Sequence, residues 1–350
     1  MKPSNAARFL LAFCCLLPAS LAAQSDAYEK HKAAAHHAKA QGRYDEAEKN
    51  YLLALKEVEG LEGSDLRVVN ALTDLGQFCD SLRRYDEAEN YFQRALAASN
   101  AFTRKVRDPQ YEPLKSTIAA IPTERLAEFF AARRRFPEAE SYYQQAFVLW
   151  QTQAKEKVIP RASNASVIAQ LGSLAVGSKV EKAAQVCDRL AEIYVAQGRL
   201  SEAETQYRRA LTLREKEEPR EEKKLAASLG RLAMLYTREK KYADAEPLYR
   251  RKLEIARQEF GEGTAQVAAG LEQRAAFYSA QGKYAEAEAD LESALGIYEK
   301  TRGKEGTEVA LTLEHLARLM RRMERFAEAE KHEARAKAIR DRNTLAPPPD

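Results

Sequence analysis

Residues 282–288 read GKYAEAE, and variants of this seven-residue phrase recur along the chain. Every copy places an alanine between two acidic residues. The seven copies are GRYDEAE from Gly42, RRYDEAE from Arg83, RRFPEAE from Arg134, GRLSEAE from Gly198, KKYADAE from Lys240, GKYAEAE from Gly282 and ERFAEAE from Glu324. The alanines are Ala47, Ala88, Ala139, Ala203, Ala245, Ala287 and Ala329, and their successive spacings are 41, 51, 64, 42, 42 and 42 residues. Such periodic self-similarity predicts a repeat architecture.

Each phrase has the composition of a turn between two helices. An amphipathic stretch such as VAAGLEQRAAFYSAQ (267–281) precedes it, and the glycine or basic residue that starts the phrase is suited to end that helix. The next aromatic or leucine residue is expected to pack in the corner between the helices. We expect Asp45, Asp86 and Ser201 to cap the second helix, and Pro137 to lie in its first turn. The alanine is small because the two helices cross there.

The second helix continues with an aromatic residue four positions after the alanine and a small residue three positions later. The aromatic residues are Tyr51, Phe92, Tyr143, Tyr207 and Tyr249, and the small ones are Ala54, Ala95, Ala146, Ala210, Ala294 and Ala336. This i, i+4, i+7 spacing indicates the buried face of a helix. No run of alternating β-branched residues occurs, so the sequence predicts an all-α fold.

The two patterns together resemble the tetratricopeptide repeat. Its first-helix series of apolar, small and aromatic residues is matched by Leu190-Ala191 with Tyr194, by Leu232-Ala233 with Tyr236 and by Leu126-Ala127 with Phe130. The 42-residue period and the stretch AEPLYRRKLEI (245–255) are similar to the longer repeats of kinesin light chains and their bacterial relatives. The resemblance implies a right-handed superhelical solenoid of about seven helix-turn-helix repeats. It also implies a non-catalytic module that binds proteins or peptides.

Several residues depart from this pattern. Lys252 stands where the fifth repeat should have its second small residue, and Arg274 replaces a leucine in the sixth. Met320 and Glu333 replace aromatic residues in the seventh repeat, and Ala38 does so in the first. More polar end repeats are consistent with capping of the array.

The spacings suggest a division of the chain. We expect repeats 1–3 over residues 28–158, an insertion or linker over 159–177, repeats 4–7 over 178–340 and a disordered tail over 341–350. The insertion contains Pro160 and a short apolar patch from Val167 to Val176. It is either a partial extra helix packed in the array or a docking element that divides it.

The N-terminus has the features of a secretory signal. Lys2 and Arg8 precede the apolar stretch Phe9–Ala22, which ends in the small residues of a cleavage site. We therefore expect residues 1–22 to be a signal peptide and the protein to be exported, periplasmic or secreted. After cleavage no integral membrane span is expected. Retention of the stretch as an anchor is the alternative.

Cleavage would leave two cysteines, Cys79 and Cys187. The register places them two repeats apart, beyond the reach of a disulfide, so we expect two buried free thiols. The five histidines, His31, His36, His37, His315 and His332, do not form a helical metal motif. The acidic pairs of the phrase recur in every repeat, which an active site would not do. We therefore expect no enzyme activity, no metal site and no cofactor.

The charge pattern argues against nucleic acid as a partner. The formal net charge is only +4, from 56 basic and 52 acidic residues, and the two signs are interleaved. A peptide or protein segment is the partner expected for a groove lined by the first helices of the repeats.

The register projects a set of residues into that groove. They are Asn70, Thr73, Gln77 and Asp80 in repeat 2, Glu124 and Glu128 in repeat 3, Asp188 and Glu192 in repeat 4, Arg231, Met234 and Arg238 in repeat 5, and Glu314, Arg318, Arg321 and Arg322 in repeat 7. Its middle would be acidic and its C-terminal end basic, which suits a segment of mixed charge. Alternatively, these residues are ordinary solvated helix faces.

A second function remains open from the sequence. The protein could be a structural scaffold in an envelope complex, using the convex face and the insertion at 152–180.

Overall fold

The computed structural model describes residues 19–61, 65–105, 112–151 and 178–345. In these ranges all regular structure is helical, which confirms the predicted fold class. The chain divides into two compact units, Met1–Val186 and Cys187–Asp350, and the boundary falls inside helix α9 (Lys179–Gln197). No helix in the described ranges is long and apolar enough to cross a membrane.

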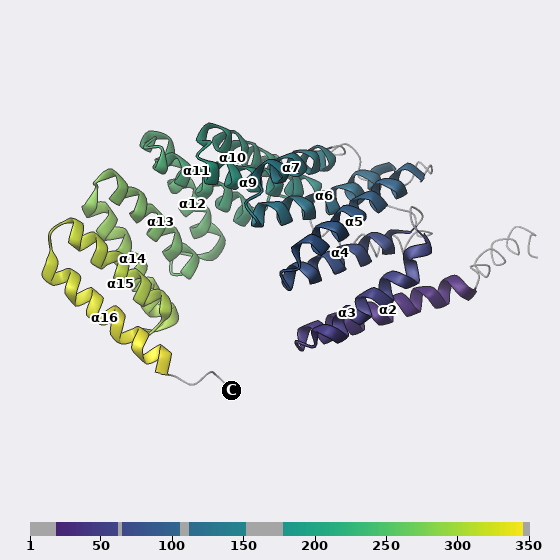
Figure 1. The fold of residues 1–350 in the computed structure, drawn as a ribbon. Helices are drawn as coiled ribbons and strands as arrows, with labels where there is room; N and C mark the ends of the chain where they lie inside the picture. The colour runs from purple at the N-terminus through teal and green to yellow at the C-terminus, as the bar shows by residue number, and fades with distance from the viewer. Residues whose placement is uncertain (1–18, 62–64, 106–111, 152–177, 346–350) are drawn as a thin grey trace, which may run out of the picture. The chain divides into compact units, whose positions relative to one another are not determined.

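Unit 1 contains three helix pairs joined by tight turns. They are α2 (Ala19–Ala40) with α3 (Tyr44–Val58), α4 (Leu66–Ser81) with α5 (Tyr85–Lys105), and α6 (Glu112–Ala132) with α7 (Phe136–Gln151). The short 3-10 helix η1 (Glu59–Leu61) follows α3. The second helix of a pair also packs on the first helix of the next, as α3 does on α4 and α5 on α6 (Figure 1).

Unit 2 continues this arrangement. It holds the C-terminal part of α9 with α10 (Leu200–Glu215), α11 (Glu222–Arg238) with α12 (Tyr242–Phe260), α13 (Ala265–Gln281) with α14 (Tyr284–Arg302), and α15 (Thr307–Arg322) with α16 (Phe326–Leu345). We call the first helix of each pair helix A and the second helix B. Two consecutive A helices, α11 and α13, also contact each other directly. The helix pairs coincide with the seven predicted repeats.

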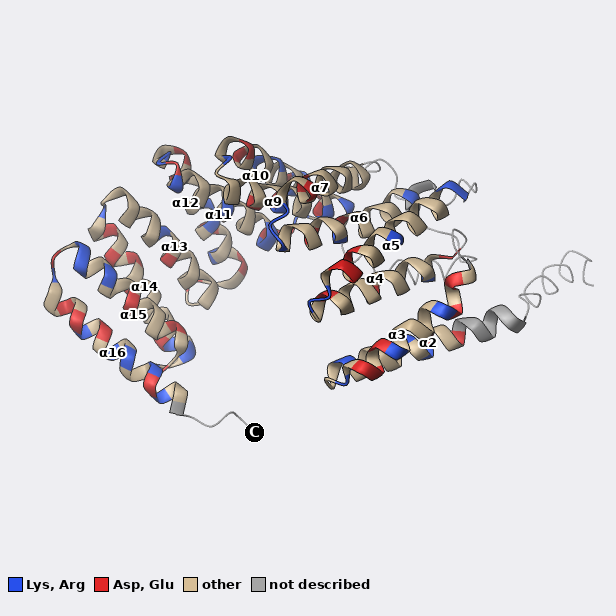
Figure 2. Cartoon of the chain, in the orientation of Figure 1, with Lys and Arg blue, Asp and Glu red and all other residues tan. Residues whose placement is uncertain are grey.

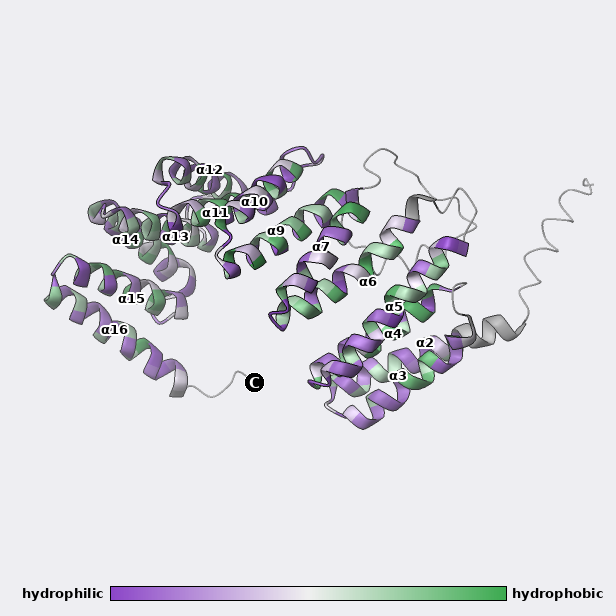
Figure 3. Ribbon diagram, turned by 45° about the horizontal axis from the view of Figure 1, so that its top comes forward, coloured by the Kyte–Doolittle hydropathy of each residue, from purple (hydrophilic) through white to green (hydrophobic). Residues whose placement is uncertain are grey.

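The repeated small and aromatic residues form the core. All seven phrase alanines, including Ala203, are fully buried, and the stripe represented by Tyr207 and Ala210 also belongs to the buried core. Each alanine lets helices A and B approach closely, while the aromatic ring fills the space beside the crossing. Apolar and polar residues alternate along α15 and α16 (Figure 3), and acidic and basic residues are interspersed along α16 (Figure 2).

The turn between the two helices has the same geometry in every pair. The first phrase residue has a left-handed backbone, with φ of 72° at Gly42 and 59° at Lys240. The next residue donates its N–H to the carbonyl of the residue five positions earlier, as Arg84 does to Cys79 at 2.9 Å. These are the bonds of a Schellman C-cap. The sequence prediction that this residue ends helix A is confirmed.

The expected N-caps are wrong by two residues. Helix B begins at the aromatic or leucine of the phrase, so α3 starts at Tyr44 and Asp45 lies inside its first turn. The basic residue before it, such as Arg43 or Arg199, occupies the N-cap position and makes no side-chain cap bond. Asp86 and Ser201 likewise lie inside their helices. Acidic residues are still favourable there because the helix N-terminus is positive.

We expected the aromatic residue of each phrase to pack in the corner between the helices, but not all of them do. Tyr44, Tyr85 and Phe326 are 49%, 44% and 55% exposed. Tyr85 contacts the next repeat, since the guanidinium of Arg133 lies 4.1 Å from the centre of its ring. The hydroxyl of Tyr242 similarly donates to the carbonyl of Ala280 at 2.9 Å.

Two further expectations concern the cysteines and the ends of the chain. Cys79 and Cys187 are buried free thiols, as predicted. Helix α16 continues to Leu345, so the first residues assigned to a disordered tail are helical. Residues 159–177 and the predicted signal through residue 18 lie outside the described ranges, and those assignments stay predictions.

Candidate interaction surface

The acidic pairs of the phrase are structural. Arg84 donates to Glu87 in its own repeat at 2.7 Å and to Glu48 of the preceding repeat at 2.7 Å. The same double pairing occurs at Arg135, with Glu138 and Glu89, and at Arg325, with Glu328 and Glu288. The basic N-cap residue therefore joins consecutive repeats, and the carboxylates are engaged rather than available for acid–base chemistry.

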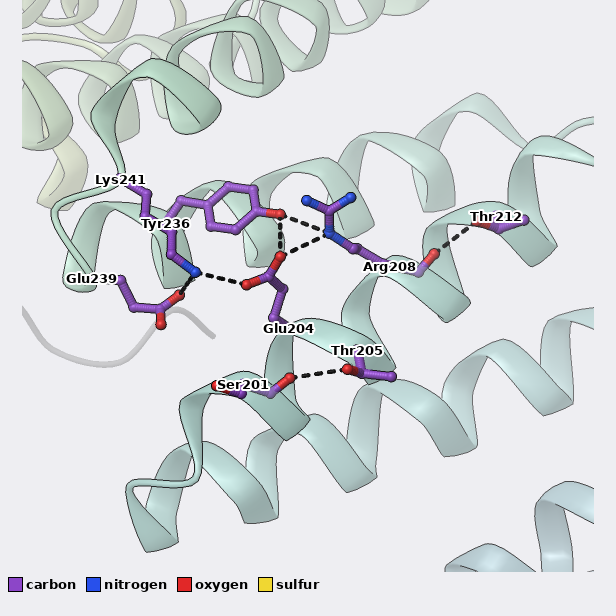
Figure 4. Close-up of polar contacts among 8 residues, drawn as sticks. All are labelled: Ser201, Glu204, Thr205, Arg208, Thr212, Tyr236, Glu239 and Lys241. Carbon is purple, nitrogen blue, oxygen red and sulfur yellow. Dashed lines mark hydrogen bonds and ion pairs between the residues drawn. The ribbon is translucent and has the colours of Figure 1, made fainter.

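Glu204 holds this inter-repeat position in the fourth repeat (Figure 4). Its carboxylate accepts from Lys241 at 2.8 Å, from the Tyr236 hydroxyl at 2.9 Å and from Arg208 at 2.9 Å. These bonds, with Lys241 contributing most, hold the pKa of Glu204 below its ordinary value. Lys241 also pairs with Glu239 at 3.3 Å. Arg208 and Tyr236 of this network also line a pocket, together with residues such as Leu211 and Pro247.

In unit 1 the projected groove residues are only partly available. Asn70 and Thr73 are buried, so the expectation that they face a ligand is wrong, and Thr73 donates to the carbonyl of Val69 at 2.7 Å. Gln77 is exposed. Asp80 is half-buried and pairs with Arg133, which directly follows the next A helix, α6.

The two glutamates of α6 differ from each other. Glu128 pairs with Arg125 at 2.7 Å. Glu124 accepts from the Trp150 indole at 3.2 Å, and burial followed by repulsion from Glu128 raises its pKa. Both acidic residues of this stretch therefore already have partners inside unit 1.

In unit 2 Asp188 is buried and does not offer its charge to the surface, contrary to expectation. Its Oδ2 accepts from Arg214 of α10 at 2.7 Å and from Arg231 of α11 at 3.0 Å. Burial raises the pKa of Asp188, and the two arginines oppose that rise. Glu192 is exposed and pairs with Arg189 at 3.0 Å. The acidic residues of this repeat are therefore already compensated.

The predicted arginines of the last repeat surround a pocket of about 390 Å³, which we call the α13–α15 pocket. Its apolar lining comes from both A helices and from α14. The lining residues are Glu272, Ala275, Ala276, Ser279, Leu291, His315, Arg318, Leu319, Arg321 and Arg322. The sequence register thus brought Arg318, Arg321 and Arg322 to one site.

The arginines around the pocket differ in whether their side chains already have hydrogen-bond partners. Arg321 forms two hydrogen bonds with Glu333, at 2.8 and 2.7 Å, and Arg322 donates to Ser279 at 3.1 Å. Arg318 is exposed and has no side-chain partner among the described residues. Its guanidinium is therefore free to meet an acidic ligand.

Glu272 and His315 were missed by the sequence projection. Glu272 accepts from Thr312 at 2.8 Å and lies 3.3 Å from the His315 ring nitrogen, so one carboxylate links α13 to α15. Glu272 lies three residues before the small residue Ala275, and His315 lies three residues before the projected Arg318. Extending the same helical spacing one turn earlier could have found them. Glu314, which was projected, pairs with Arg340 at 2.7 Å instead.

The exposed surface extends along α11. Met234 is 58% exposed, and Arg238 is exposed as projected. Among the described residues no group of histidine, cysteine and acidic side chains could hold a metal ion. His36, for example, hydrogen-bonds with the Tyr51 hydroxyl at 3.2 Å.

Comparisons with known proteins agree with this architecture. A family model for the tetratricopeptide repeat matches residues 26–101, 183–258 and 266–342. None of the curated proteins matches the sequence.

Several solved structures are similar. BtubC (BKLC) from P. vanneervenii is 23% identical, with a TM-score of 0.53 over 74% of this chain and 94% of that one. The apo form of RapI is 13% identical, with a TM-score of 0.50 over 91% of this chain and 99% of that one. A putative kinesin light chain of Podosopora anserina is 18% identical, with a TM-score of 0.48 over 67% and 96% of the two chains. At these identities the likeness concerns the fold.

Proposed function

Because this chain belongs to the tetratricopeptide repeat family, we propose that it is a protein-interaction module whose A helices in unit 2 bind an extended segment of another protein. The family fold generally serves protein interaction rather than catalysis. The proposed binding surface consists of the α13–α15 pocket and the exposed face of α11 that carries Met234 and Arg238.

The observation that supports this proposal is the combination of an apolar pocket with a free arginine beside it. Ala275, Leu291 and Leu319 can accept an apolar side chain, and water would be displaced from them on binding. Arg318 can meet an acidic group next to that side chain, which would favour association and set the register of the segment. Met234 adds a flexible apolar contact for a segment that continues toward α11.

Selection of random peptides against the full chain tests this proposal. Selected peptides are then titrated against Ala276→Glu, a substitution at an exposed pocket residue of α13. The added side chain fills the pocket and repels an acidic group, so binding should be lost. Ala289→Glu is the matched control, because Ala289 is exposed on the B helix α14 and outside the pocket lining. Equal affinities of the two variants would contradict the proposal.

We also infer export to the periplasm or the exterior, on the basis of the charged start and the apolar stretch Phe9–Ala22. Intact-mass measurement of protein expressed with its own N-terminus should show the loss of residues 1–22. Recovery of the full-length chain from the cytosol would contradict the inference. The scaffold alternative relies on the insertion at 152–180, nearly all of which lies outside the described residues, and no specific contact favours it.

A further inference from the structure

Lys252 occupies a position that six of the seven repeats give to alanine. In those repeats the residue is buried, as at Ala210 and Ala294. Lys252 is instead half-buried on α12, and its ammonium donates to the side-chain oxygen of Gln273 on α13. The side chain of a B helix therefore reaches the adjacent A helix, where the proposed binding surface lies.

Space for this side chain comes from a glycine on α11. A Cβ atom on Gly230 would lie 2.9 Å from the Lys252 ammonium nitrogen and 3.3 Å from its Cδ. Helix α11 thus lacks a side chain at the point where the ammonium passes. Since α11 and α13 contact each other directly, the ammonium lies at the meeting of two consecutive A helices.

The charge of Lys252 is not compensated within the described residues. Its side-chain partner there is the neutral Gln273, and no carboxylate pairs with it. The nearby charged group that affects it most is Arg231, which is also positive. Arg231 directs one nitrogen to Asp188 at 3.0 Å, but 38% of its side chain is exposed. The Lys252 ammonium passes beside Gly230, the residue that precedes Arg231 in α11, so the two cations come from adjacent positions and each keeps further N–H donors.

An uncompensated cation that is partly removed from water is unfavourable for folding. Burial and the charge of Arg231 together lower the pKa of Lys252. Six repeats avoid this cost with alanine, and a local departure that weakens the fold without internal compensation points to a role outside folding. An anion supplied by a ligand would provide the missing charge.

We propose that Lys252 and Arg231 form an anion subsite between α11 and α13 that receives an aspartate or glutamate side chain of the bound segment. This inference rests on the proposed function, and it specifies the partner as an acidic segment. An ammonium and one edge of a guanidinium offer donors for a single carboxylate, which matches one acidic side chain. A second acidic group would meet Arg318 beside the α13–α15 pocket.

Two fluorescein-labelled probe peptides test the subsite, one of alternating glutamate and alanine and the other of alternating glutamine and alanine. Fluorescence anisotropy should show that the full chain binds the glutamate peptide about tenfold more tightly, as expected for charge-assisted hydrogen bonds. Lys252→Ala should remove most of this preference. The matched control is Arg250→Ala, which removes an exposed positive charge from the same helix. It should leave the preference nearly intact.

Lys252→Ala introduces the residue that the other repeats carry, so it should fold, and a circular dichroism melt checks this. An unchanged glutamate preference in Lys252→Ala, or equal loss in Arg250→Ala, would overturn the subsite. Ala276→Glu separates this result from the proposed function. If Ala276→Glu weakens both peptides while Lys252→Ala changes neither, the pocket stands and the subsite fails. If only Lys252→Ala has an effect, the subsite stands and the pocket is wrong.

Discussion

The ammonium nitrogen of Lys252 lies only 2.9 Å from the position that a Cβ atom on Gly230 would occupy. The two residues are on different helices of one pair, α12 and α11. The long side chain of Lys252 fits because residue 230 is a glycine and has no side chain in its path. Glycine in the interior of a helix costs about 1 kcal/mol relative to alanine. The fifth repeat therefore carries two unfavourable residues at one helix crossing.

Replacement of Lys252 by alanine should stabilise the protein. The substitution removes a partly buried, uncompensated cation and introduces the residue found in the other repeats, so we expect a gain of roughly 0.5–2 kcal/mol at neutral pH. Urea unfolding of both proteins measures it. A loss of stability would show that Lys252 belongs to the fold rather than to a binding site.

The stability difference should also depend on pH. Burial and Arg231 lower the pKa of folded Lys252 below 10.5, its value in the unfolded chain. Between these two values the unfolded state binds more protons, so the wild-type protein gains stability as the pH rises. The advantage of Lys252→Ala should therefore be largest below the folded-state pKa and shrink as the pH approaches 10.5. Unfolding curves over this range measure it, and a constant difference would contradict the assigned environment.

The helix-pair register is tested at Ala203, which is fully buried where α9 and α10 cross. Ala203→Arg should cost roughly 1–3 kcal/mol from overpacking, and desolvation of the charge adds to this. Because each repeat is supported by its neighbours, the melting transition should also broaden or split. Glu202→Arg is the control, since Glu202 is exposed and pairs with Arg199 at the surface. It should cost about 0.5 kcal/mol. Similar melting curves for the two variants would refute the register.

Much of the fold could be predicted because the residues of the phrase meet steric requirements of the turn and of the helix crossing that are the same in every repeat. Ala203 must be small at a helix crossing, and Gly42 is suited to a left-handed turn, wherever the repeat lies. The position of the N-cap was not predictable from Asp45, because the Schellman turn fixes where helix B begins. The burial of Asp188 depends on Arg214, which reaches it from another helix 26 residues away. Helix periodicity predicts which face of a helix a residue lies on, but it does not predict whether a long side chain from another helix covers that residue.

Introducing glycine at the left-handed turn position should change the stability of the protein. Lys240 has φ of 59°, a conformation that places Cβ under strain, whereas three other repeats use glycine. Lys240→Gly should therefore raise stability by up to about 1 kcal/mol. The reverse substitution, Gly282→Ala, should lower it by about 1 kcal/mol, because Gly282 has φ of 78°. Thermal melts measure both changes, and effects of the same sign would contradict the turn geometry.

Cys79 and Cys187 should resist modification in the folded protein. Burial raises the pKa of Cys79, and it raises that of Cys187 to about 12, so little reactive thiolate forms near neutral pH. A thiol reagent should label neither residue before unfolding. It should label both in denaturant without prior reduction, since both are free. Rapid labelling of the native protein would contradict the buried positions in α4 and α9.

The binding surface itself can be mapped by photo-crosslinking. A peptide selected against the full chain is given a photoreactive group at each position in turn, and the crosslinked residues are identified by mass spectrometry. We predict crosslinks on the A helices α11, α13 and α15, including residues of the α13–α15 pocket such as Ala276 and Arg318. Crosslinks confined to the B helices α12, α14 and α16, or to unit 1, would contradict the account.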